Sequence, residues 1–267
     1  MQPSYSPPAT SPAPRIGDWL NEALSLFGRN WVTWCLQGLL YSLLPLVPLL
    51  VGMGVFGFGM YTALGVSTAN GSVRTEPNVA VVLGVVLAAT GIGLVPCLAM
   101  LAYFLVGMMH TATRQLRGEP IALGDMFQPG IVGIMGIALR AMGASLVVGL
   151  VVVLGLLLCV VPGLLAAALF FYVHPLIVER RLGVWAAMSE SIRLTRPHLV
   201  NYTLWMLLIY LVQAIGSAVV IGYIVTLPLS VLMWMIAYRD ATGDPIFSPS
   251  SAVAATNAPE FLPWNEG

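Results

Sequence analysis

The sequence predicts an all-α polytopic membrane protein that crosses the bilayer six times. The first observation is composition, because 58% of the 267 residues are hydrophobic and only 8% are charged. In a soluble domain about 25% of residues are charged. The second observation is that long apolar runs separate the few charged segments. A soluble chain of this length could not bury so much apolar surface. This composition excludes a soluble enzyme, a nucleic-acid binder and a disordered chain.

Charge-free segments locate the spans. They cover residues 30–73, 77–113, 141–178 and 197–238. A helix that crosses the hydrocarbon needs about 20 apolar residues, so the first two segments hold one span each and the last two hold two each. The apolar residues run continuously, which indicates helices and not alternating strands. The predicted spans are 31–55, 80–108, 135–158, 162–178, 199–216 and 218–238.

Turns and prolines subdivide these segments. Residues 159–163 contain Pro162-Gly163, a turn signal that also suits the start of a helix, and residues 214–217 form a weaker break. Further prolines predict interruptions within spans 1, 2 and 6, at Pro45, Pro48, Pro96 and Pro228.

The arginines predict the orientation of the chain. There is no Lys, and with both termini in the cytoplasm every Arg except Arg74 lies on the cytoplasmic side. Such an excess of positive charge marks the cytoplasmic face of membrane proteins. The membrane domain is predicted at residues 15–242, between two Pro-rich, disordered cytoplasmic tails at 1–14 and 243–267.

Amphipathic helices are predicted before spans 1 and 5, in the headgroup layer with their apolar side toward the membrane. The apolar stripe of 18–31 is formed by Leu20, Leu24, Phe27 and Trp31, and that of 184–199 by Trp185, Met188, Ile192 and Leu199. A comparable helix before span 3 is an open alternative. Residues 126–139 either belong to a span that begins before Arg140 or form a shallow re-entrant segment. Arg140 itself either extends to the interface or is a buried functional residue.

Motifs for catalysis are absent from the sequence. It contains no HExxH, Walker A or GxGxxG motif, and Ser145 is not in a nucleophile elbow. Residues 122–125 resemble the Gly-x-Gly-Asp motif of intramembrane aspartyl proteases, but no second acidic residue lies in a span. We therefore expect Asp125 to cap a helix start and Ser145, with Ala141 and Gly149, to let two helices approach closely.

Metal and cofactor sites are not expected either. The three histidines, His110, His174 and His198, form no ligand pair on one helical turn and are predicted to be interfacial. No ionisable residue falls at a predicted mid-membrane position. The polar side chains expected within the spans are Gln37, Ser42, Thr90, Ser145, Thr203, Gln213 and Thr226.

A basic cytoplasmic surface is the remaining candidate site. It comprises Arg180, Arg181, Arg193 and Arg196. Each Arg near anionic headgroups contributes about 1 kcal/mol to membrane attraction. These residues are predicted to contact membrane lipids or a partner protein.

Residues 174–183, followed by Ala187, Ser191, Leu194 and Thr195, resemble a group of uncharacterised bacterial six-span membrane proteins. That group includes the membrane domain attached to some glycerophosphodiester phosphodiesterases. The segment from Gly17 to Trp31 and residues 238–243 are similar to its first helix and closing motif. The resemblance implies a six-helix domain in the bacterial cytoplasmic membrane with no established activity, and it supplies no catalytic residue.

The function expected from the sequence is that of a non-enzymatic membrane module. It would contact lipids or partner proteins, or a second copy of itself, at the cytoplasmic face. The alternative is a transporter for a small or lipidic substrate, because transporters use proline-broken spans to form binding sites. A membrane-depth cavity lined by polar groups would favour this alternative.

Overall fold

The structure of the protein is a computed structural model that describes residues 15–69, 79–127 and 131–243. The predicted terminal tails lie outside these residues, except for Gly243. All regular structure in the described ranges is helical. Six stretches are long and apolar enough to cross a membrane, which confirms the predicted all-α polytopic membrane protein. They cover Trp31–Ala63, Val79–Leu116, Leu139–Leu158, Val160–Arg180, Val184–Ser217 and Gly222–Thr242.

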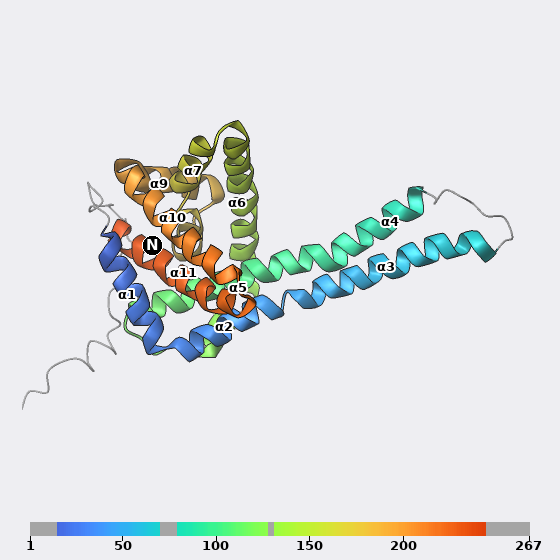
Figure 1. Cartoon of the computed structure of the whole chain (residues 1–267), viewed down its shortest axis with the longest axis horizontal. Coiled ribbons are helices and arrows are strands. Elements are labelled where there is room, and N and C mark those ends of the chain that lie inside the picture. The colour runs from blue at the N-terminus through green and yellow to red at the C-terminus, as the bar shows by residue number, and fades with distance from the viewer. Residues whose placement is uncertain (1–14, 70–78, 128–130, 244–267) are drawn as a thin grey trace, which may run out of the picture.

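The first half of the chain forms the short helix α1 and a long helical hairpin, in which α2 and α3 make one arm and α4 and α5 make the other. In Figure 1, α3 and α4 lie side by side and project away from the other helices. A π-helical turn, Thr90–Leu94, joins α4 to α5. The helices are α1 (Ile16–Arg29), α2 (Trp31–Leu43), α3 (Leu46–Ala69), α4 (Val79–Ala89) and α5 (Val95–Leu116).

The second half forms two further hairpins. The α6–α7 hairpin points in a different direction from the α3–α4 hairpin, and α10 packs against α11 (Figure 1). Short 3₁₀ helices at Leu123–Phe127 and Arg196–His198 precede α6 and α10. The helices are α6 (Ile131–Leu158), α7 (Val160–Leu169), α8 (Val173–Arg180), α9 (Val184–Thr195), α10 (Leu199–Ser217) and α11 (Val220–Thr242).

Both predicted turns are confirmed. Cys159, in an extended conformation, is the single residue between α6 and α7. The weaker break also ends a helix, because α10 stops at Ser217 and α11 begins at Val220.

One interruption was not predicted from the sequence. The fourth span breaks between α7 and α8, where Phe170, Phe171 and Tyr172 form a turn. The hydroxyl of Ser191 on α9 accepts the Tyr172 N–H at 3.0 Å and donates to the Leu169 carbonyl at 2.7 Å. A neighbouring helix thus supplies the hydrogen bonds that the break removes, as buried backbone groups require.

The predicted proline interruptions form in spans 1 and 2 but not in span 6. Pro45 lies between α2 and α3, and the π-helical turn precedes Pro96, whereas α11 continues through Pro228. Proline cannot donate to the carbonyl four residues earlier, which is that of Ile224. Gly38 of α2 lies against this carbonyl, so close packing by α2 covers the altered turn.

The two predicted amphipathic helices are present, and the sides that they bury against other helices differ from the apolar stripes predicted to face the membrane. On α1 the buried residues are Trp19 and Ala23, while Leu24 is 50% exposed. On α9 the buried face includes Ala187 and Ser191, and Trp185 is 73% exposed. The physical reason is that apolar side chains are equally stable against lipid and against protein. Small side chains, rather than large ones, mark the face that approaches other helices.

The open alternatives around span 3 are resolved. Residues 131–158 form one continuous helix, and the apolar stretch long enough to cross a membrane begins at Leu139, just before Arg140, so residues 131–139 do not form a separate re-entrant segment. The short 3₁₀ helix Leu123–Phe127 stands where a third amphipathic helix was possible. Arg140 is exposed, and its guanidinium donates to the Arg181 carbonyl at 3.3 Å. Arg140 therefore lies level with the α8–α9 turn and not in the interior.

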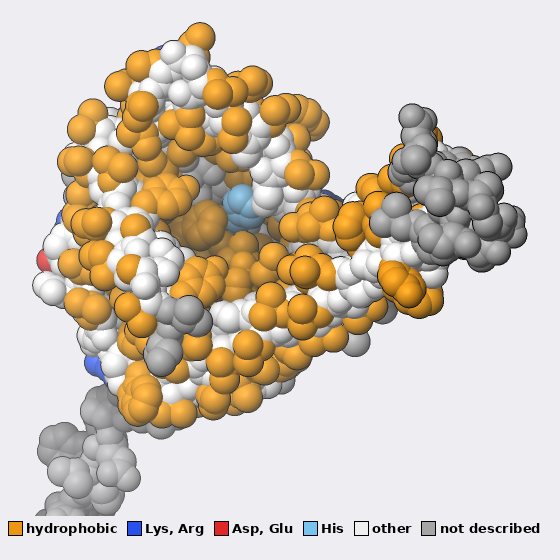
Figure 2. Space-filling view, turned by 45° about the vertical axis from the view of Figure 1, so that its right-hand side comes forward, with side chains coloured by type: hydrophobic (Ala, Val, Ile, Leu, Met, Phe, Trp, Pro, Cys, Tyr) orange, Lys and Arg blue, Asp and Glu red, His pale blue; other side chains and the backbone are white. Residues whose placement is uncertain are grey.

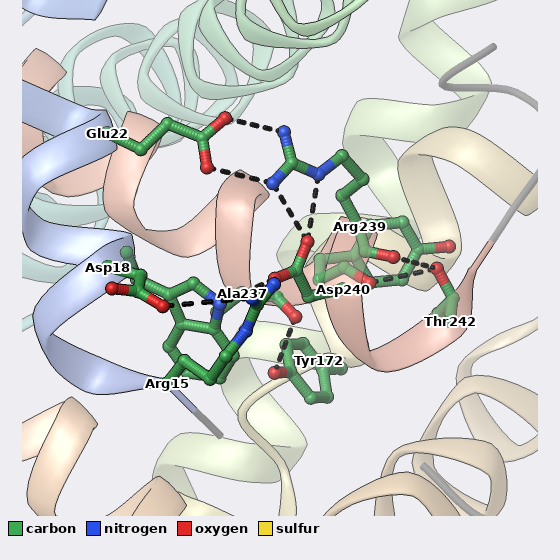
Figure 3. Close-up of polar contacts among 10 residues, drawn as sticks. Arg15, Asp18, Glu22, Tyr172, Ala237, Arg239, Asp240 and Thr242 are labelled. Carbon is green, nitrogen blue, oxygen red and sulfur yellow. Dashed lines mark hydrogen bonds and ion pairs between the residues drawn. The ribbon is translucent and has the colours of Figure 1, made fainter. Parts of the chain in front are cut away.

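The two ends of the described chain meet in a network that we call the α1–α11 clamp (Figure 3). It comprises Trp19 and Glu22 of α1 with Arg239 and Asp240 of α11. Arg239 makes a bidentate ion pair with Glu22 at 2.7 and 2.9 Å. The Trp19 indole N–H donates to Asp240 at 2.8 Å. The beginning of α1 and the end of α11 consequently lie on the same face of the molecule.

Candidate functional site

A cavity of about 430 Å³ lies among the spans, and we name it the His174 cavity. Figure 2 shows it as a hollow with a histidine inside a rim of hydrophobic side chains. All six spans contribute to its wall. The lining residues are Tyr41, Leu105, Ser145, Val148, Gly149, Val152, Ala167, Phe170, Phe171, His174, Met206, Ile209, Tyr210, Gln213, Tyr223, Leu227, Ser230, Val231 and Trp234.

Small side chains on α6 and α7 create this space. Ser145, Gly149 and Ala167 all line the cavity, and a Cβ added at Gly149 would have no neighbour within 4 Å. The expectation that Ala141, Ser145 and Gly149 let two helices approach closely was therefore wrong at Gly149. The break between α7 and α8 contributes Phe170 and Phe171 to the opposite part of the lining.

His174, which the sequence predicted to be interfacial, is the central polar residue of the cavity. It lies in the first turn of α8, directly after the break. Its Nε2 atom is 2.7 Å from the Ser145 hydroxyl, and its ring packs edge-on against Trp234 at 5.5 Å. The Trp234 indole N–H donates to the Phe171 carbonyl at 2.7 Å, which connects the break to α11.

The hydrogen bonds of Ser145 define the chemistry of this pair. Its hydroxyl donates to the Ala141 carbonyl at 2.9 Å while contacting His174. Both bonds form at once only when His174 Nε2–H is the donor to Ser145. In that arrangement the serine proton is directed at the backbone and not at the imidazole. A serine nucleophile needs the opposite arrangement, with the imidazole as proton acceptor, so the pair suits binding better than acyl transfer.

Other polar groups in the lining are uncharged. The side-chain oxygen of Gln213 is buried and has no hydrogen-bond partner in the described part of the chain. The Ser230 hydroxyl donates to the Thr226 carbonyl at 2.8 Å. No Arg, Lys, Asp or Glu occurs among the described residues that line the cavity. Cavities of this size and character, with apolar walls and a few placed polar groups, are typical of small-molecule sites.

The predicted basic surface lies elsewhere and is partly neutralised. Glu190 accepts from Arg193 at 2.5 and 2.8 Å and pairs with Arg180 at 3.5 Å. Arg181 and Arg196 are exposed. None of these four arginines lines the His174 cavity.

Arg181 ends α8 with a φ of 54°. This left-handed conformation is one that glycine adopts at lower cost. The backbone of Arg181 is therefore strained.

Asp125 has the structural role that the sequence predicted. It accepts the Ala122 N–H at 2.7 Å and forms an ion pair with Arg114. In the described ranges, no three His, Cys, Asp or Glu residues gather closely enough to hold a metal ion.

The cavity brings together residues for which the sequence predicted no mutual contact. Ser145 and Gln213 were among the polar residues expected within spans, but nothing in their spacing placed them beside His174. No local pattern predicted the break at residues 170–172 that precedes His174. Searches for related proteins add nothing to this chemistry, since no protein-family model, no curated protein and no solved structure matches the chain.

Proposed function

We propose that this integral membrane protein binds a small lipidic molecule in the His174 cavity and transports it without chemical change. The cavity is the observation that carries the proposal. Its walls come from all six spans, so it lies at the depth of the membrane, where lipidic molecules are concentrated. Apolar walls favour such a ligand, because each buried CH₂ group contributes about 0.8 kcal/mol.

Local interruptions of the helices support transport over permanent storage. The break between α7 and α8 and the break between α2 and α3 both flank residues of the cavity wall, Phe170 and Tyr41. Transporters form their binding sites near the bilayer midplane from interrupted helices of this kind.

Filling the cavity tests the proposal. Gly149→Phe adds a ring at the cavity wall, where a Cβ meets no atom within 4 Å, and Gly143→Phe on the same helix is the control, since a Cβ at Gly143 is equally free but lies outside the lining. Native mass spectrometry of gently extracted protein should find a bound lipidic molecule in the wild type and in Gly143→Phe, but not in Gly149→Phe. Equal retention by both variants would contradict binding in this cavity.

Transport itself is tested in proteoliposomes. Any molecule identified in this way should cross the bilayer faster with wild-type protein than with Gly149→Phe. Equal rates would leave binding intact and rule out transport.

We further propose that Arg181 and Arg196 contact anionic lipid headgroups at the cytoplasmic face. The strained backbone of Arg181 supports this second function, because strain often persists where a side chain serves a role. Replacing both residues with Gln should reduce co-purified anionic phospholipid. Arg193→Gln is the control, because Glu190 already neutralises this charge. Unchanged lipid content in the double variant would argue against the contact.

A further inference from the structure

We infer that the ligand of the His174 cavity is an uncharged lipid that carries a hydroxyl group, and that the single proton of this hydroxyl is shared between the oxygen acceptors of Ser145 and Gln213. The inference rests on the proposed binding function and specifies its substrate class. It follows from the charge and the hydrogen-bonding capacity of the lining.

The absence of charge in the lining excludes an ionised ligand. The described lining contains no Arg, Lys, Asp or Glu that could neutralise a carboxylate, a phosphate or an ammonium group, and the His174 imidazole that donates Nε2–H to Ser145 and keeps an acceptor nitrogen is neutral. An ion taken from water into such a site loses several kcal/mol of solvation without compensation. A fatty acid anion or a phospholipid headgroup is therefore a poor occupant.

The remaining hydrogen-bonding capacity of the fixed polar groups is that of acceptors. The hydroxyl protons of Ser145 and Ser230 are directed at the Ala141 and Thr226 carbonyls. The Trp234 indole proton is directed at the Phe171 carbonyl. What these groups still offer to a ligand is oxygen lone pairs on the two serines.

The side-chain oxygen of Gln213 is the lining atom that most needs a hydrogen-bond donor. Its side-chain oxygen is buried without a partner in the described chain, and it belongs to the cavity lining. Buried polar atoms are normally hydrogen-bonded, and an unsatisfied one is costly. A ligand hydroxyl would satisfy this oxygen, whereas an ether or ester has no proton to donate to it.

His174 also favours a ligand that donates a hydrogen bond. With Nε2–H donating to Ser145, the imidazole has only an acceptor nitrogen left. The three tyrosines of the lining can either donate or accept, so they accommodate the oxygen lone pairs of the same hydroxyl. Aliphatic and aromatic walls then hold the hydrocarbon part.

Photoreactive analogues that differ in one functional group test the inference. Three diazirine-bearing C16 chains would be compared at pH 9 in nanodiscs: the primary alcohol, its methyl ether and the carboxylate. Cross-linked peptides are mapped by mass spectrometry. The alcohol should label segments 145–152, 167–174 and 206–213 of wild-type protein several-fold more than the other two compounds do.

Variants identify the groups responsible. Ser145→Ala and Gln213→Leu should each lower labelling by the alcohol about 3- to 10-fold, the effect of losing one hydrogen bond, and leave labelling by the ether unchanged. Thr203→Ala on α10 is the control, since Thr203 lies outside the lining and its hydroxyl donates to the Leu199 carbonyl at 2.8 Å.

The outcomes separate the two proposals. Equal or stronger labelling by the carboxylate or the ether would overturn the substrate class and leave the binding function standing. Labelling of the cavity segments by none of the three compounds, or labelling that Gly149→Phe does not reduce, would overturn both.

Discussion

At Gly38, α2 approaches the backbone of α11 more closely than any side chain would allow. A Cβ at this position would lie 2.2 Å from the Ile224 carbonyl oxygen and 3.3 Å from the Pro228 ring. The same carbonyl lacks its helical donor because residue 228 is proline. One missing side chain and one missing N–H group therefore allow two spans to pack without a kink.

Gly38→Ala should accordingly destabilise the protein by about 1–3 kcal/mol through overpacking. Thermal unfolding in detergent measures the effect. Gly28→Ala is the matched control, because nothing lies within 4 Å of its Cβ position. That control should be neutral or slightly stabilising, since alanine favours helix. A neutral Gly38→Ala would show that the contact adjusts at little cost.

At the scale of single elements, the break between α7 and α8 depends on a helix that follows it in the chain. Ser191 is fully buried and bonds to both sides of the break, at Leu169 and Tyr172. Thr195, one turn later, also approaches the Leu169 carbonyl at 3.3 Å. α9 thus holds the turn that positions His174.

Ser191→Ala should cost about 1–3 kcal/mol, the penalty for leaving the buried Tyr172 N–H without its partner. It should also weaken ligand retention, because Phe170 and Phe171 line the cavity. Differential scanning fluorimetry and native mass spectrometry measure the two effects. Ser189→Ala, on the exposed side of the same helix, should change neither. Wild-type stability of Ser191→Ala would refute this role of α9.

The α3–α4 hairpin depends on backbone contact between two glycines. A Cβ on Gly52 would lie 2.5 Å from the Gly93 Cα atom, within the π-helical turn, whereas Gly54 has open space. Gly52→Leu should therefore separate the hairpin and speed amide exchange in residues 79–94, and Gly54→Leu should not. Hydrogen exchange mass spectrometry in detergent makes the comparison. Identical exchange in both variants would contradict the predicted separation.

The spans were predictable and the break was not, for physical reasons. A charge in hydrocarbon is so costly that charge-free runs reveal where spans lie. The break at residues 170–172 contains neither proline nor glycine, and its stabilising partner, Ser191, lies 19 residues beyond Tyr172. Local patterns report local preferences, so a turn that depends on a distant side chain leaves no local signal.

At the scale of the whole molecule, the α1–α11 clamp connects the two ends of the membrane domain. Arg239 and Asp240 lie in the last turn of the last span, and they bind residues that precede the first (Figure 3). Trp19 also packs against Trp205 at 5.2 Å, so the clamp extends into the aromatic core. An even number of spans predicts that both ends share one face, whereas the contact between them needed the structure.

Asp240→Asn should destabilise the protein by about 1–3 kcal/mol, because it weakens charge-assisted hydrogen bonds to Trp19 and Arg239. Its unfolding temperature should fall by several degrees. Asp18→Asn is the control, since Asp18 forms only a 3.7 Å pair between exposed side chains. Equal unfolding temperatures for the two variants would show that the clamp is not a stabilising contact.

The cavity likewise belongs to the scale of the whole molecule. Its lining combines side chains from all six spans, and sequence spacing within one helix cannot show which residues of different helices meet. The arginines were predicted to form a contact surface because charges are rare in this chain. The structure places them outside the cavity. Glu190 pairs with Arg180 and Arg193, and Glu22 pairs with Arg239.

The clamp also sets an order of events during synthesis. Trp19 and Asp240 are separated by 221 positions, and ribosomes add about 5–20 residues per second. After its synthesis, α1 must therefore wait roughly 10–45 seconds for Asp240. The contact between Trp19 and Asp240 consequently forms only after the six described spans have been synthesised.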